Sequence, residues 1–360
     1  MKKIIAILVV FAMVAAVAFA ETTVFGSVET RWAIAQDTGS GVTTQGWQHA
    51  ATAGLSAVND EGTLGGMFKL TFADDGHPND GSSGDVMAWV RPDRFFVWWQ
   101  PIPQVRFFLG EDGDGLMNSA NIIRWAHHRM PRGIAVEGWD GSDYLLGNYD
   151  NFGAVISIMP IDWVTLHVAL GLGARESNGS NGAMDFSDLF QDHLQIQAVI
   201  APEGIGTFYL TYRQNSVSSW PVSTDRIGLT YLSGSFIEGL QFEVGGNYAL
   251  TGNDDPIRFA IGATYSLDAF GVRFRAVMHP RSSFFFFQAD VMPYYAFDFG
   301  TLFFNIRLCQ ENSNNIGWHI NPYLRMNIGG GDLRVGFLLE DHDGNGSFTW
   351  KLPISMLVSF

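Results

Sequence analysis

The sequence predicts an all-β fold: a transmembrane, antiparallel up-and-down β-barrel of about 16 to 18 strands, with one loop folded inward as a constriction. Three observations lead to this fold class. Short segments of alternating apolar and polar residues recur along most of the chain. No segment after the N-terminus offers about 18 consecutive apolar residues for a spanning helix. The final segment keeps one apolar face up to its last residue. Strands can cross a bilayer only when they close into a barrel, because open edges would leave backbone groups unsatisfied.

The N-terminus predicts export. Lys2 and Lys3 precede an apolar run from Ile4 to Phe19, and the small residues Ala18 and Ala20 mark a cleavage site. This is the pattern of a secretory signal peptide, and the run is too short for a spanning helix. We therefore expect residues 1–20 to be removed and residues 21–360 to form a single barrel domain.

The last segment, Ser347 to Phe360, is the clearest strand. Every second residue from Phe348 to Phe360 is apolar, which is the period of a strand with one greasy face. This segment could be the edge strand of a secreted β-sandwich protein. A closed barrel explains it better, because the last strand then pairs with the first and its apolar face contacts lipid. Here the chain resembles bacterial outer-membrane β-barrel proteins, whose final strand commonly ends in Phe and is recognised by the barrel-assembly machinery. The resemblance gives that role to Phe360, Val358 and Met356.

Composition narrows the class. Without Lys2 and Lys3 the chain has 19 basic and 36 acidic residues, a formal charge of −17, so nucleic acid is not an expected partner. Aromatic residues make up 14% of the chain, as suits barrels whose apolar residues face lipid. The single cysteine, Cys309, excludes an internal disulfide framework and reads as a small buried residue.

Turn residues separate the alternating segments. Asn59 to Gly62 and Gly329 to Asp332 are typical of tight hairpins, and long polar links alternate with such short ones. The expected strands, in order, are 24–34, 47–58, 64–72, 86–100, 105–109, 152–159, 163–171, 193–201, 207–214, 226–232, 240–249, 257–267, 272–279, 284–295, 301–310, 318–328, 333–340 and 347–360.

The alternation stops between Glu111 and Asp150. About 40 residues without a strand pattern inside a compact domain usually form a functional loop. This loop opens with Glu111, Asp112 and Asp114 and continues with a helix-like piece near residues 121–129. An acidic, partly helical loop after the fifth strand resembles the constriction loop of the general porins. That resemblance implies an infolded loop whose carboxylates face arginines on the opposite wall.

Basic residues fall on the strand faces opposite the apolar ones. A charge facing lipid near the bilayer midplane costs roughly 2–4 kcal/mol, so these residues must face inward if the strands span a membrane. We expect them to line a pore and to set an electric field across it. A simpler interpretation is that they are solvated wall residues paired with acids such as Glu243 and Asp290. The expected pore-lining set is Arg31, Lys69, Arg106, Arg258, Arg273, Arg275, Arg307, Arg325 and Arg334.

Enzyme motifs are missing from the sequence. It contains no Gly-x-Ser-x-Gly elbow, no His-Glu-x-x-His and no phosphate-binding glycine loop. The adjacent His127 and His128 form a weak metal pair. We expect no catalytic site, metal or other cofactor.

The resemblance to general porins implies an outer-membrane, water-filled channel for passive diffusion of small hydrophilic solutes and ions, and a homotrimer. The negative charge of the chain favours a weak cation preference. Two alternatives remain: a substrate-specific channel that uses inward aromatic residues to bind sugars or other small molecules, and a structural or adhesive surface barrel.

Overall fold

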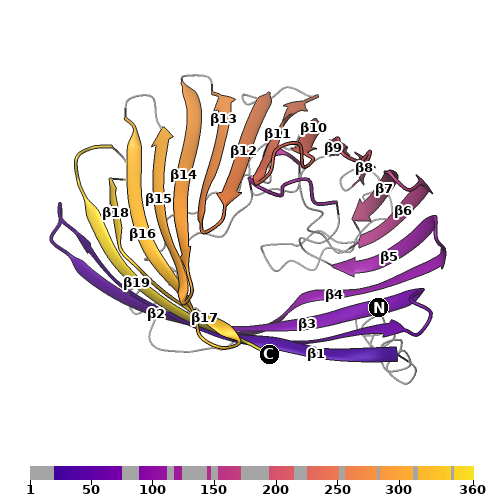
Figure 1. Ribbon diagram of the computed structural model, residues 1–360, viewed down its shortest axis with the longest axis horizontal. Helices are drawn as coiled ribbons and strands as arrows, with labels where there is room; N and C mark the ends of the chain where they lie inside the picture. The colour runs from indigo at the N-terminus through magenta and orange to yellow at the C-terminus, as the bar shows by residue number, and fades with distance from the viewer. Residues whose placement is uncertain are drawn as a thin grey trace, which may run out of the picture.

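The structure is a computed structural model, and it describes residues 20–74, 89–111, 117–123, 144–146, 153–171, 194–214, 225–250, 256–281, 284–310, 315–341 and 344–360. Within these residues the chain is a single sheet in which every strand is antiparallel to its neighbours. Because β1 pairs with both β2 and β19, the sheet closes on itself (Figure 1). No helix in this part of the chain is long and apolar enough to cross a membrane.

The ring has 18 strands, at the upper end of the predicted range, and the all-β fold class is confirmed. The bounds of the strands are β1 Ala20–Asp37, β2 Thr43–Asn59, β3 Leu64–Asp74, β4 Trp89–Ile102, β5 Val105–Glu111, β6 Gly153–Ile161, β7 Val164–Gly171, β8 Leu194–Ile200, β9 Gly206–Arg213, β10 Arg226–Ser233, β11 Leu240–Ala249, β12 Ile257–Leu267, β13 Phe270–Pro280, β14 Phe285–Phe297, β15 Gly300–Gln310, β16 Gly317–Asn327, β17 Gly331–Gly336, β18 Leu338–Asp341 and β19 Thr349–Ser359.

β17 and β18 are two halves of one strand, since both pair with β16 and with β19. The interruption falls at Phe337. Its N–H donates to the carbonyl of Pro322 at 3.0 Å, but proline has no N–H to return the second bond of the pair. The ladder is therefore incomplete at this point.

The two faces of the wall differ in chemistry. On β15 the side chains of Leu302, Phe304, Ile306 and Leu308 are exposed, whereas the alternate residues from Phe303 to Cys309 are buried. The exposed residues lie on the outside of the ring. The buried ones share their face with the loop segments that follow β5, which pack inside the ring.

Two described pieces of that loop, residues 117–123 and 144–146, pack against the inner wall. Ile123 and Leu145 join a buried cluster with Ala260 on β12 and Val277 on β13. Met117 packs instead against Phe108 on β5 and residues of β6 and β7. The first piece, purple in Figure 1, thus runs along the inside of the wall from β5 toward β12. For these two described pieces of the loop, the predicted infolding is confirmed.

Candidate functional site

One row of six polar residues and a glycine crosses the inner wall where the loop meets it. Neighbouring members lie directly opposite each other in the strand register. The row, called the polar row below, consists of Glu243, Gly262, Arg275, Asp290, Arg307, His319 and Glu340, on β11 to β16 and β18.

Asp290 is the centre of the buried charge in this row. Its Oδ2 accepts a hydrogen bond from Arg275 Nε at 3.1 Å, and its Oδ1 accepts one from Arg307 Nε at 2.8 Å. All three side chains are at most 5% exposed. Two of the predicted pore-lining arginines are therefore held inside the wall by a shared carboxylate, an arrangement that keeps buried charge compensated.

The loop crosses the polar row at Gly262. The Glu243 carboxylate accepts the backbone N–H groups of Asn121, Ile122 and Ile123 at 2.8, 2.8 and 2.9 Å. On the other side of Gly262, Arg275 Nη1 donates to the carbonyl of Ile123 at 2.7 Å. These loop residues are bends in the chain, and the rest of the predicted helix-like piece lies outside the described residues.

Glycines make room for the loop on three consecutive strands. A Cβ atom at Gly262 would lie 2.8 Å from Ile122, one at Gly245 would lie 2.8 Å from Leu145, and one at Gly228 would lie 3.0 Å from Leu146. A larger residue at any of these three positions would push against the loop.

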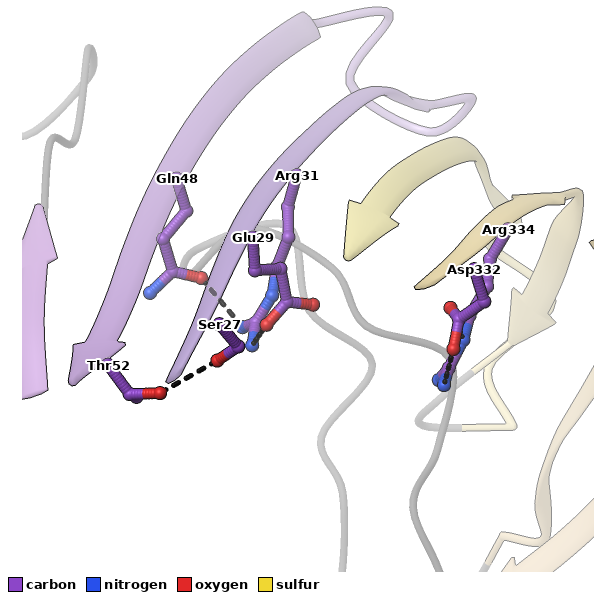
Figure 2. Close-up of polar contacts among 7 residues, drawn as sticks. All are labelled: Ser27, Glu29, Arg31, Gln48, Thr52, Asp332 and Arg334. Atoms are coloured by element: carbon purple, nitrogen blue, oxygen red, sulfur yellow. Dashed lines mark hydrogen bonds and ion pairs between the residues drawn. The ribbon is translucent and has the colours of Figure 1, made fainter. Parts of the chain in front are cut away.

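A second set of charged residues lies on the wall formed by β17, β19, β1 and β2. Arg31 Nη2 donates to Glu29 at 2.8 Å and its Nη1 donates to Gln48 at 2.9 Å. Arg334 Nε donates to Asp332 at 2.8 Å. Figure 2 shows both carboxylate–guanidinium pairs, with Ser27 bonded to Thr52 beside the first pair.

The two pairs have the same orientation along their strands. β1 and β17 are both antiparallel to β19 and hence parallel to each other, and each carries an acid two residues before an arginine. Ser355 on β19 lies opposite both Arg31 and Arg334, so the two arginines share one row. Arg325 on β16 extends this row, and its Nη2 lies 3.1 Å from Asp332 with 47% of its side chain exposed.

The remaining predicted basic residues have separate partners. Arg106 is exposed, stacks on Trp98 at 4.7 Å and donates to Gln100. Arg273 lies over the Tyr294 ring at 5.6 Å, and Arg258 lies over the loop residue Tyr144 at 5.8 Å. Lys69 is half-buried on β3, opposite Arg94 in the register. The nine residues thus do not form one cluster.

Most of the acidic residues predicted for the constriction lie outside the residues that the structure describes. Glu111 ends β5, opposite Phe95, but its side chain is not described. Asp112 and Asp114 lie outside the described residues.

Inward aromatic residues pack against one another. Tyr294, Phe303 and Tyr323 form a row across β14 to β16, with ring centroids 5.6 and 4.7 Å apart. Phe303 and Tyr323 are each 8% exposed. Their faces are covered, which leaves little surface for stacking a sugar.

The C-terminal residues close the ring. The N–H of Gly26 donates to the carbonyl of Phe360 at 2.9 Å, and the N–H of Phe360 donates to the carbonyl of Gly26 at 3.0 Å. Val358 and Met356 lie opposite Val28 and Thr30 and are exposed on the outer face. A Cβ at Gly26 would lie 2.6 Å from the Phe360 ring and 2.6 Å from the carbonyl oxygen of Thr52, and because the backbone oxygen cannot move aside, this position favours glycine.

The fold is a closed antiparallel β-barrel, and the comparisons with known proteins bear on this fold. No protein-family model matches the sequence, and no curated protein matches it. Solved structures do match over 94% of the chain. OpdL of Pseudomonas aeruginosa is covered over 99% of its length, with a TM-score of 0.62 and 11% identity.

Two further structures support the same fold. OccK8 (OprE) of Pseudomonas aeruginosa is covered over 98% of its length, with a TM-score of 0.61 and 9% identity. A substituted form of the Rh. blastica porin is covered completely, with a TM-score of 0.50 and 13% identity. At these identities the likeness establishes the fold.

Proposed function

We propose that the protein is a channel of the bacterial outer membrane through which small hydrophilic solutes and ions diffuse passively. One observation carries the proposal: the ring of strands is closed, apolar outside and charged inside. Lipid is the solvent that suits the outer face, and water is the solvent that suits the inner face. The loop segments against β5 to β15 narrow the interior.

The charged groups of the wall set the selectivity. We assign the solute-contacting role to the predicted basic residues that keep exposed surface, above all Arg31, Arg106 and Arg325. Glu111, Asp112 and Asp114 supply the opposing negative charge at the constriction. The charges of the wall pairs Arg31–Glu29 and Arg334–Asp332 largely cancel, so the charge of −17 that the chain carries without Lys2 and Lys3 produces a weak cation preference.

Unselective diffusion is favoured over a binding channel. A sugar track needs aromatic faces open to the solute, and the row Tyr294, Phe303, Tyr323 is packed closed. Current that is unaffected by added sugars would agree with this. Saturable block of the current by one solute would instead establish a substrate-specific channel.

Export and assembly follow from the two ends of the chain. We propose that residues 1–20 direct secretion, that the strand ending in Phe360 is recognised by the barrel-assembly machinery, and that the mature chain assembles as a homotrimer in outer-membrane lipid. N-terminal sequencing of the purified protein, and its mass in detergent by light scattering, test the first and last of these.

Planar-bilayer recording tests the channel itself. Purified, folded protein should produce stepwise conductance, which neutral polymers of increasing size should reduce until they no longer enter. Reversal potentials across a salt gradient should indicate a weak cation preference, and anion preference would show that the wall arginines dominate. Folded protein that inserts without conducting would refute the channel and favour a structural or adhesive barrel.

A further inference from the structure

The loop and the wall exchange hydrogen bonds in an uneven way. Four wall side chains donate to loop carbonyl groups: Gln197 to Met117 at 3.0 Å, Arg275 to Ile123 at 2.7 Å, Asn247 to Tyr144 at 2.8 Å and Arg213 to Leu146 at 3.1 Å. Among the described contacts, the backbone N–H groups of the loop that reach the wall all go to Glu243. The donors are spread over several strands, whereas the acceptor is a single side chain.

Glu243 is suited to this task by charge and by burial. It is 0% exposed, so its charge depends on the three amides that it accepts. Hydrogen bonds to an ionised acceptor are about twice as strong as neutral ones. Removing the carboxylate would leave three amide N–H groups without their acceptor, which is costly in a buried place.

The position of Glu243 also fixes where the loop crosses the wall. Glu243 and Arg275 lie on either side of Gly262 in the polar row, and both hold Ile123. The side chains of Ile122 and Ile123 fill the space above Gly262. Residues 121–123 therefore lie over a single glycine, with a hydrogen-bonding wall residue on each side.

We infer that Glu243 is a positioning residue of the channel: it holds residues 121–123 on β12 and thereby fixes the cross-section left open to solutes. The inference rests on the proposed channel function. It makes residues 121–123 a fixed part of the wall, because the Glu243 carboxylate binds their backbone and Gly262 leaves room for their side chains.

The first experiment measures the loop directly. In folded protein in detergent, the Ile122 and Ile123 amides should exchange with deuterium slowly, and Glu243→Ala should speed their exchange by orders of magnitude. Asp341→Ala is the matched control, since this buried carboxylate lies outside the polar row and also accepts backbone N–H groups, those of Asn345 and Gly346. That control should leave the exchange of the two amides unchanged.

Conductance gives the second readout. Glu243→Ala should replace the single conductance level of the wild type by several levels with a larger mean. Glu243→Gln keeps the shape of the side chain but presents an NH₂ group toward the amides, so its exchange rates and conductance should fall between those of the wild type and Glu243→Ala. If Glu243→Ala does not fold, Glu243→Gln still allows the positioning role to be tested by the same two measurements.

A disulfide tether completes the design. A Cβ at Gly262 would lie 3.2 Å from the Ile122 Cβ, close to the usual separation in a disulfide of about 3.5–4.5 Å. Ile122→Cys with Gly262→Cys, in a Cys309→Ala background, should cross-link on oxidation. The tether should restore a single conductance level to Glu243→Ala, and reduction should abolish the rescue.

The outcomes separate the two proposals. Wild-type amide exchange in Glu243→Ala, or no rescue of the Glu243→Ala conductance by the cross-linked pair, overturns the positioning role. Absence of conductance in the wild type overturns the channel instead, and amide exchange then still reports whether Glu243 holds residues 121–123.

Discussion

Asp290 and Arg307 lie directly opposite each other on β14 and β15, and their ion pair is closed from the other side by Arg275. The carboxylate therefore serves two guanidinium groups that are almost fully buried. One of these groups also holds the loop, because Arg275 donates to Ile123. The charge of the wall and the placement of the loop thus depend on the same acid.

Asp290→Ala should lower the free energy of unfolding by about 3–5 kcal/mol, because it leaves Arg275 and Arg307 buried without their counter-ion. Urea titration of the protein folded into lipid vesicles measures the change. Asp60→Ala, in the exposed β2–β3 turn, is the control and should shift the midpoint little. Equal stability of the two variants would show that water reaches both arginines.

A charge on the outer face should be costly only near the middle of the strands. Ile306 lies at the middle of β15 and faces outward between Val291 and Ile320. Ile306→Arg should cost roughly 2–4 kcal/mol of stability in lipid, whereas Phe297→Arg, at the end of β14, should cost about 0–1 kcal/mol. Similar small costs at both positions would contradict lipid on the outside.

Removal of Phe360 should weaken closure of the ring. The deletion loses two backbone hydrogen bonds with Gly26, a net loss of about 2 kcal/mol at roughly 1 kcal/mol each. The yield of heat-modifiable, folded protein in the outer membrane measures assembly. Phe360→Ala keeps the backbone hydrogen bonds. Its comparison with the deletion therefore separates the contribution of the phenyl side chain from that of the main chain.

Neutralising the arginines of the β1–β17 wall should increase cation preference. Arg31→Gln with Arg334→Gln removes two positive charges and leaves Glu29 and Asp332 in place. The reversal potential across a salt gradient should move toward the cation value. Glu29→Gln with Asp332→Asn should move it the opposite way, and no shift in either variant would show that ions do not pass this wall.

Most strands could be predicted from the sequence because one face of each must be apolar. The expected segment 257–267 coincides with β12, and 240–249 coincides with β11. The first strand is longer than expected, since Thr22 and Gln36 continue its pairing with β2 without an apolar signal. The break at Phe337 was missed, because it depends on a proline in the neighbouring strand.

The place where the loop contacts the wall could not be predicted from the sequence. Glu243 looked like one of several acids able to pair with arginines, and Gly262 like an ordinary strand glycine. Their roles arise from contacts with residues more than 100 positions away in the chain. The available signal was that Glu243 is the only charged residue on β11, but this did not identify its partner.

The pairing of β1 with β19 makes closure of the whole sheet depend on its last strand. A product that stops before Thr349 would expose two strand edges whose hydrogen-bonding groups have no mate, in a place where lipid cannot replace one. Chains truncated there should therefore fail to close the barrel, and the eleven residues of β19 decide whether the sheet can close.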